Sequence, residues 1–408
     1  MDGALRNWER ALRGGDEQAR LPLASAYQRL GQVEEALRIL GEASEPDGPT
    51  QALLRETWRG ELSRLAPAQR IPGARPYGEL WGWAGEAAVL TSHERASGLL
   101  GVVDWARGRF AYEAPPTGPV LQPPAAAGPD ELLIPGEPGL LERLDLETGR
   151  IRSQRVGAGG QIMEFDSTRS RALLRYVEPG RRLVLSVLRL EDGAEEFQRS
   201  GGPKLRVVPN WDQGWIAWRD SGGPLEWGWL PTPDPQRVDP AGALAGREGH
   251  LTPLAAMGRF LLAREARGGL LCDPRSGERL ELRELPGSAH GPWRLSLDRQ
   301  ALLGFRLGVP AAFPIHGATS PGAPAQALTL PGGPGLSRAS WHPHVDVVAL
   351  GRRDAGAELR SLEGEVWLHL PRDAQPLGWG PQGRSLVVVR ALGSLGGLLE
   401  LWTPGGTL

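Results

Sequence analysis

The chain has 408 residues, which is enough for two or three ordinary domains, or for a small domain followed by one large assembly of repeats. Its 46 basic and 48 acidic residues give a formal net charge of −2, so no excess of positive charge argues for nucleic-acid binding. The 57 Gly and 37 Pro alternate with short apolar runs, which indicates many tight turns and argues against disorder.

Lysine and cysteine each occur only once in the chain. Lys204 is followed by Leu205, so the Gly-Lys-Ser/Thr sequence of a phosphate-binding loop is missing. Cys272 cannot form an internal disulfide, which fits a reducing compartment. The first 20 residues are charged, and no run of about 18 apolar residues occurs anywhere. We therefore expect a cytoplasmic protein without membrane insertion.

Apolar and small side chains recur at helical spacing in residues 20–40. This stretch resembles a tetratricopeptide repeat, since the family's spacing is matched by Leu23, Ala24, Tyr27, Gly31, Ala36 and Leu40. The resemblance implies a protein-binding role in which Tyr27 is a candidate contact. Only one whole repeat is present, whereas such repeats usually need three or more to be stable alone. We expect the helical segment, residues 1–66, to lean on the rest of the chain or on a partner.

Short apolar runs recur through the remaining residues, 67–408. Eight of them, whose first residues are 39 to 45 positions apart, occupy 87–92, 131–136, 172–177, 215–220, 260–265, 301–306, 346–351 and 385–390. Most are followed by a second strand-like stretch and a hairpin. Four short antiparallel strands at a period near 43 residues are typical of a β-propeller blade.

The pattern resembles the WD-repeat and quinoprotein-like propellers of bacteria. "WGPQGRSLVVV" at 379–389 is close to the aromatic-x-Pro-x-Gly sequence that starts a strand in those families. The predicted fold is therefore mainly β, an eight-bladed propeller with a small N-terminal all-α segment. Seven blades are the alternative, because "PVLQPPAAAGPD" at 119–130 is a poor strand.

The last blade lacks an outer strand, because its third strand at 397–402 is followed by a turn and the end of the chain. Outer strands elsewhere begin with Arg or a polar residue and end in Pro or Gly. "AQRIPGARP" at 68–76 has the same features. We expect residues 68–76 to supply the missing strand and close the ring, which removes an unpaired edge. The alternative is that these residues are a linker.

No catalytic or cofactor motif is evident. The nucleophile elbow, the HExxH motif and the EF-hand loop are all missing from the sequence. "WHPHVD" contains His342, His344 and Asp346, which could ligate zinc. The stretch falls where a blade's first turn is expected, and Pro343 suits a turn. We therefore interpret it as structural and expect no bound metal or cofactor.

Tryptophan is abundant, with 15 in the chain. Five crowd the fourth blade and two occupy the first, namely Trp211, Trp215, Trp218, Trp227, Trp229, Trp81 and Trp83. One interpretation is packing between blades. The other is an exposed aromatic patch for a partner, since Trp is enriched at binding hot spots.

The leading functional hypothesis is a non-enzymatic interaction scaffold or adaptor in a bacterial multiprotein assembly. Both resemblances imply recognition surfaces whose partners are other proteins, although a fold alone does not fix a function. The alternatives are a small-molecule or peptide sensor that uses the propeller channel, and a hydrolase or lyase with a site assembled from several blades.

Overall fold

The computed structural model gives the arrangement of most of the chain. It describes residues 2–43, 47–74, 77–84, 87–92, 100–114, 125–128, 130–135, 139–155, 161–166, 171–178, 182–191, 194–220, 223–230, 236–237, 251–264, 268–282, 284–315, 328–329, 336–352, 356–391 and 397–406.

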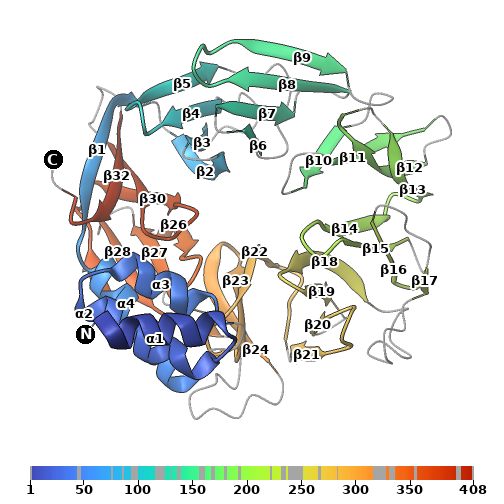
Figure 1. Cartoon of the computed structure of the whole chain (residues 1–408). Coiled ribbons are helices and arrows are strands. Elements are labelled where there is room, and N and C mark those ends of the chain that lie inside the picture. The colour runs from blue at the N-terminus through green and yellow to red at the C-terminus, as the bar shows by residue number, and fades with distance from the viewer. Residues whose placement is uncertain are drawn as a thin grey trace.

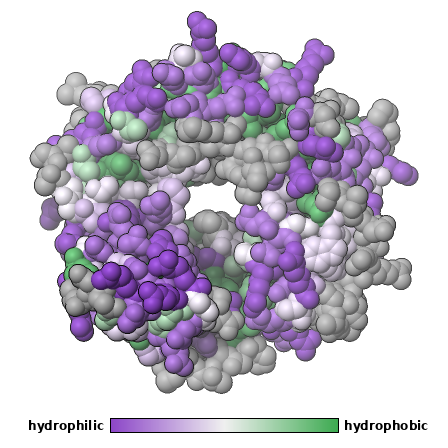
Figure 2. All heavy atoms as spheres, in the orientation of Figure 1, coloured by the Kyte–Doolittle hydropathy of each residue, from purple (hydrophilic) through white to green (hydrophobic). Residues whose placement is uncertain are grey.

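Within these residues, the strands form eight four-stranded antiparallel sheets arranged around a central opening (Figures 1 and 2). A few helices precede them in the chain. The predicted fold class, an eight-bladed propeller with a small N-terminal helical segment, is confirmed, and the seven-bladed alternative is wrong.

Blades one to four follow one another in the chain, and each sheet is ordered as its strands occur in sequence. Blade one contains β2 (Tyr77–Ala84), β3 (Ala87–Ser92), β4 (Leu100–Asp104) and β5 (Arg109–Ala114). Blade two contains β6 (Ala125–Gly128), β7 (Glu131–Pro135), β8 (Leu140–Asp145) and β9 (Ile151–Arg155). Blade three contains β10 (Gln161–Phe165), β11 (Arg171–Val177), β12 (Leu183–Arg189) and β13 (Glu195–Gly201). Blade four contains β14 (Arg206–Asn210), β15 (Trp215–Arg219), β16 (Glu226–Trp229) and β17 (Gln236–Arg237).

Blades five to seven continue the same order. Blade five contains β18 (Thr252–Met257), β19 (Phe260–Arg264), β20 (Gly269–Cys272) and β21 (Arg279–Leu282). Blade six contains β22 (Ala289–Leu295), β23 (Ala301–Arg306), β24 (Val309–Pro314) and β25 (Leu328–Thr329). Blade seven contains β26 (Leu336–Trp341), β27 (Val347–Arg352), β28 (Gly356–Ser361) and β29 (Val366–His369).

Blade eight is assembled from both ends of the chain. Its inner strands are β30 (Ala374–Trp379), β31 (Leu386–Ala391) and β32 (Gly397–Pro404), and its outer strand is β1 (Leu65–Ala74). β1 pairs antiparallel with β32, and Ile71 faces Leu399 in the register. The segment expected at 68–76 therefore pairs with the last strand as far as Ala74, and the strand begins earlier, at Leu65. Residues 75–76 lie outside the described part of the chain.

Burial explains why the apolar runs mark one strand of each blade. The second strand lies in the middle of its sheet, and each sheet packs against a neighbouring blade on both faces. Accordingly, residues 347–351 of β27 are all buried, whereas β9 at the outer edge of blade two is largely exposed. A strand buried on both faces carries a continuous apolar run rather than an alternating pattern.

The helical segment contains α1 (Asp2–Arg13), a 3-10 turn η1 (Glu17–Ala19), α2 (Arg20–Arg29), α3 (Val33–Gly41) and α4 (Gly48–Leu62). The Asp47 carboxylate accepts a hydrogen bond from the Thr50 amide at 2.9 Å and so caps α4. No helix in the described part of the chain is long and apolar enough to cross a membrane. The resemblance to a tetratricopeptide repeat, and the boundary at residue 66, stay predictions.

The helical segment leans on the ring. Figure 1 shows the helices over blade seven, in blue at the lower left. Leu23, Leu40 and Trp58 share one buried core with Val347 of blade seven and Val388 of blade eight. Helices too few to bury their own apolar faces are thus stabilised by the propeller.

Candidate protein-binding groove

The tryptophans of blade four are mainly core residues. Trp215 is fully buried and packs with Leu261 of blade five, whereas Trp218 packs with Leu185 of blade three. Trp227 is also buried and shares the cluster of Trp215. The interpretation of Trp215, Trp218 and Trp227 as part of an exposed partner patch is therefore wrong, because their rings fill the wedges between blades.

The other two tryptophans of blade four are half-buried. The Trp211 indole nitrogen donates a hydrogen bond to a carboxylate oxygen of Glu164 at 2.9 Å. The Trp229 ring lies 4.8 Å from that of Trp227, and the guanidinium carbon of Arg275 lies 4.8 Å from the Trp229 ring centroid. Both are anchored within the ring, and their partner-binding role stays a prediction.

The remaining candidates lie on other parts of the molecule. The Trp83 indole nitrogen donates to the carbonyl oxygen of Trp379 at 2.8 Å and so ties blade one to blade eight. Tyr27 is half-buried on α2, and its hydroxyl donates to the Glu9 carboxylate. The side chain of Trp81 lies outside the described part of the structure. Tyr27, Trp83 and the tryptophans of blade four thus form no single site.

The "WHPHVD" stretch forms the turn between β26 and β27. The His342 amide donates to the carbonyl oxygen of Val347, five residues later, at 2.8 Å. The same five-residue bond occurs at Asp166 and Ser296, and in each turn a side-chain acceptor binds backbone amides. His342 therefore occupies a repeated capping position, as Asp166 does in blade three and Ser296 in blade six.

Both ring nitrogens of His342 are used in this turn. Nδ1 accepts hydrogen bonds from the amides of His344 and Val345, each at 3.1 Å, and Nε2 lies 3.0 Å from the Gly383 carbonyl oxygen. This fits a neutral imidazole with its proton on Nε2. Gly383 has φ of +73°, and a Cβ there would lie 2.6 Å from Nε2, so glycine permits the contact.

Burial lowers the pKa of His342 well below its ordinary value, and the nearby charges of His344 and Arg294 lower it further. The third polar residue of the stretch, Asp346, forms an ion pair with Arg294 at 2.9 Å. Among the described residues, no group of three or more His, Cys, Asp or Glu side chains could hold a metal ion. The hydrogen bonds of His342 and the ion pair of Asp346 support the structural interpretation of the stretch, and the expectation of no bound metal stays a prediction.

Two aromatic rings join this turn to the helices. The Trp58 ring of α4 meets the His342 ring edge-on at 4.5 Å, and the Trp379 ring of blade eight meets it at 4.7 Å. Trp58 also stacks on His344 at 5.8 Å. The helical segment is therefore fixed on the turns of blades seven and eight by packed rings.

A cavity of about 770 Å³ lies beside these rings, between α3 and α4 on one side and the turns of blades six, seven and eight on the other. We call it the helix–ring groove. Its apolar lining includes Leu37 and Leu54 from the helices and Leu295 and Leu297 from blade six. The groove is larger than two other cavities of the described residues, which enclose about 420 and 350 Å³. It is formed by two parts of the chain that are far apart in sequence.

Charged side chains line the same groove. Arg384 bridges the ring to the helices, because its guanidinium binds the buried Glu61 carboxylate at 2.9 Å and also binds Glu34. Arg38 pairs with Glu35 at 2.8 Å on α3. An apolar lining with fixed charges of both signs can bind an extended polypeptide, with apolar contacts for affinity and charged groups for orientation.

Sequence reasoning did not identify this groove. Its residues come from two helices and three turns, so no local motif contains them. Two features of the sequence pointed towards it. A polar residue recurs at the first turn of several blades, and the helical segment was expected to pack on the rest of the chain or on a partner.

No protein-family model matches the chain, and no curated protein matches it. Among solved structures, it is similar to BamB from Moraxella catarrhalis, with 14% identity over 83% of this chain and 99% of that one and a TM-score of 0.48. It is also similar to the β-propeller domain of Cps50 (Swd1) from Myceliophteria thermophila, with 13% identity, the same coverages and a TM-score of 0.39. A quinohemoprotein alcohol dehydrogenase, ADHIIG from Pseudomonas putida HK5, shares 11% identity over 86% of this chain and 78% of that one, with a TM-score of 0.46. These likenesses concern the fold and say nothing of what the chain does.

Proposed function

We propose that the protein is a non-enzymatic interaction scaffold or adaptor subunit of a bacterial multiprotein assembly, and that it acts in the cytoplasm. Its binding surface is the helix–ring groove, where it takes an extended segment of a partner protein. The observation that carries the proposal is the groove itself: a cavity of about 770 Å³ with an apolar lining and charges of both signs.

The size and lining of the groove favour a polypeptide. Leu295 and Leu297 are half-buried and Pro343 is exposed, so they offer apolar surface in the groove. Arg384 and Glu34 are already paired across it. A peptide that lies between the helices and the turns would bury this apolar surface, and burial of apolar area is the main source of affinity in such contacts.

The test fills the groove without disturbing its walls. Gly41, the last residue of α3, lines the groove, and a Cβ at this position meets no atom within 4 Å. Gly41→Trp should therefore occupy part of the cavity while the chain stays folded. The matched control is Gly60→Trp on α4, which also has open space around its Cβ and does not line the groove.

Partners would be recovered by affinity purification with the full-length chain and then tested as purified proteins. We expect Gly41→Trp to lose a direct partner that wild type and Gly60→Trp retain. Retention of every direct partner by Gly41→Trp would place binding elsewhere. Binding of a small metabolite with no protein partner would favour a sensor, and turnover of such a compound would favour an enzyme.

A further inference from the structure

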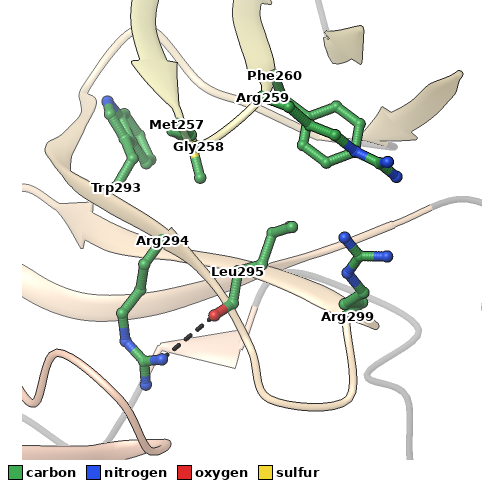
Figure 3. A pocket seen from close by; sticks show the side chains of 8 residues that line it. All are labelled: Met257, Gly258, Arg259, Phe260, Trp293, Arg294, Leu295 and Arg299. Atoms are coloured by element: carbon green, nitrogen blue, oxygen red, sulfur yellow. Dashed lines mark hydrogen bonds between the residues drawn. The ribbon is translucent and has the colours of Figure 1, made fainter. Parts of the chain in front are cut away.

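A second cavity opens next to the helix–ring groove, between blades five and six. It encloses about 420 Å³ and is lined by the turn between β18 and β19, by the end of β22, and by the turn that follows β22. We call it the arginine pocket (Figure 3). Three of its lining residues are arginines, and none of its lining residues is acidic.

Two of the arginines flank one aromatic ring. The guanidinium carbons of Arg259 and Arg299 lie 5.1 and 6.0 Å from the centroid of the Phe260 ring. Figure 3 shows these two guanidinium groups at the same end of the pocket, beside that ring. A guanidinium carries five N–H donors, so a carboxylate placed between the two groups could accept a charge-assisted hydrogen bond from each in addition to the pairs they already form.

Ion pairs outside the pocket hold the Arg259 side chain, and a turn holds the Arg299 backbone. Arg259 pairs with Glu278, and its Nε lies 3.6 Å from the Asp273 carboxylate. Neither acid lines the pocket. Arg299 sits in a hydrogen-bonded turn, where its amide donates to the Ser296 carbonyl oxygen at 2.9 Å, and its φ is +57°. A donor that is already held in place, as Arg259 is, loses little conformational entropy when it binds an anion.

The third arginine, Arg294, binds the first turn of blade seven. Arg294 points away from the other two (Figure 3), donates to the carbonyl oxygen of Val345 at 2.6 Å, and pairs with Asp346. Arg294, Leu295 and Arg299 line both the arginine pocket and the helix–ring groove. The two cavities are therefore adjacent, and a single extended ligand can reach from one into the other.

Apolar side chains share the pocket with the cations. Met257, Trp293 and Leu295 are half-buried along its walls. A uniformly anionic ligand would leave these groups without a partner, and it would meet Glu34 and Glu35 at the α3 side of the groove. The favoured ligand combines a carboxylate with neighbouring apolar groups.

We infer that the arginine pocket binds an Asp or Glu side chain of the partner segment, flanked by apolar residues that pack on Trp293 and Leu295. This inference rests on the proposed function, since it assigns the chemistry of one end of the segment that the groove would hold. The partner is thus a protein with an acidic and apolar motif in an extended region.

The variant pair comes from the two ends of β23. Arg299 precedes this strand and Leu307 follows it, and both are non-glycine residues with positive φ, +57° and +52°. Arg299→Gly removes the charge while glycine accepts the backbone conformation, so the fold should be preserved. Leu307→Gly makes the same backbone change at an exposed position that lines neither cavity, and serves as the control.

The experiment selects binders of the full-length chain from a random-sequence peptide library. One selected peptide is then made with Asp and Glu, and again with Asn and Gln in their place. We expect selected sequences to combine acidic and apolar residues, and the neutral peptide to bind about tenfold more weakly or worse. The acidic peptide should lose a similar factor on Arg299→Gly and none on Leu307→Gly.

Each other outcome has a definite meaning. Selected peptides without acidic residues, or equal binding to wild type and Arg299→Gly, would overturn the inference while leaving the scaffold proposal intact. If inorganic phosphate displaces the peptide at a far lower concentration than acetate does, the natural ligand is phosphorylated. That result would overturn the assignment of a carboxylate. If no peptide from the library binds the Gly41→Trp variant more weakly than wild type, both the proposed function and the inference are wrong.

Discussion

Two aromatic-rich regions of the ring have opposite surroundings. In blade four, Trp215 and Trp218 lie between repeated blades and are almost fully buried. On the turns of blades seven and eight, Trp58 and Trp379 enclose His342, and a large groove remains beside them. Aromatic density in the repeated part serves packing. A cavity for a partner remains where the N-terminal helices, which are not part of the blade repeat, cover the ring incompletely.

The largest expected effect on stability comes from removing the N-terminal helices, which are not part of the blade repeat. A chain that starts at Leu65 loses the helices but keeps β1, whereas one that starts at Tyr77 loses both. The first should melt below the full chain, because it exposes the core shared with Val347 and Val388. The second should melt lower still and self-associate, because β32 then has an unpaired edge.

Thermal unfolding and light scattering would measure both truncations. Equal melting temperatures for the two would mean that β1 adds nothing to ring stability. An unchanged melting temperature for the chain from Leu65 would mean that the helices are merely attached to the ring and that the shared core does not stabilise it.

The second prediction concerns the packed tryptophans of blade four. Trp215→Ala should lower the free energy of unfolding by about 3–5 kcal/mol, as expected for loss of a large buried aromatic side chain. Trp229→Ala, at a half-buried position, should cost clearly less. Denaturant unfolding of both variants is the measurement, and equal losses would show that exposure does not distinguish the two sites.

Much of the fold could be predicted because its central strands are buried on both faces. The apolar runs at 87–92 and 301–306 coincide with β3 and β23. Outer strands such as β9 have no apolar run, since an exposed edge strand needs none, and were recognised instead from an Arg or polar residue at their start. The weakest run of the sequence, near residue 125, became the short alanine-rich β6.

The site could be predicted only in part. The "WHPHVD" stretch was placed at a turn because His342 follows a strand and Pro343 suits such a position. The groove was not predicted, because it depends on how α3 and α4 pack on turns more than 200 residues away in the sequence. The burial of Trp215 was left open by the sequence, since a strand pattern gives the face of a residue but not what covers that face.

The third prediction tests the polar contact that holds the helices on the ring. Glu61 is 2% exposed, and Arg384 binds it from the turn between β30 and β31. Arg384→Ala should cost about 1–3 kcal/mol, because a buried carboxylate loses a charged partner. Arg55→Ala breaks the exposed pair with Glu363 and should cost less than about 1 kcal/mol. Similar losses in chemical unfolding would contradict the assigned role of Arg384.

The smallest expected effect is a pH dependence centred on His342. Its pKa is lowered in the folded chain by burial and by the charges of His344 and Arg294, so the unfolded chain binds protons more readily. The pKa of His344, which stacks on Trp58, is also lowered by burial. The free energy of unfolding that depends on these neutral imidazoles is fully present above the unfolded pKa of about 6.5. It falls as the pH drops below that value.

The slope should approach about 1.4 kcal/mol per pH unit for His342, whose pKa is lowered far, while the exposed His344 should add less. His342→Asn provides the comparison, because Asn210 fills a corresponding turn in blade four, where its side-chain oxygen accepts the Gln213 amide at 3.1 Å. This variant should be less stable at neutral pH, since Trp58 and Trp379 lose the ring between them. It should also show a shallower fall in unfolding free energy between pH 7 and 5. Parallel curves for wild type and variant would mean that protonation of His342 does not lower the free energy of unfolding in this pH range, which would contradict the prediction.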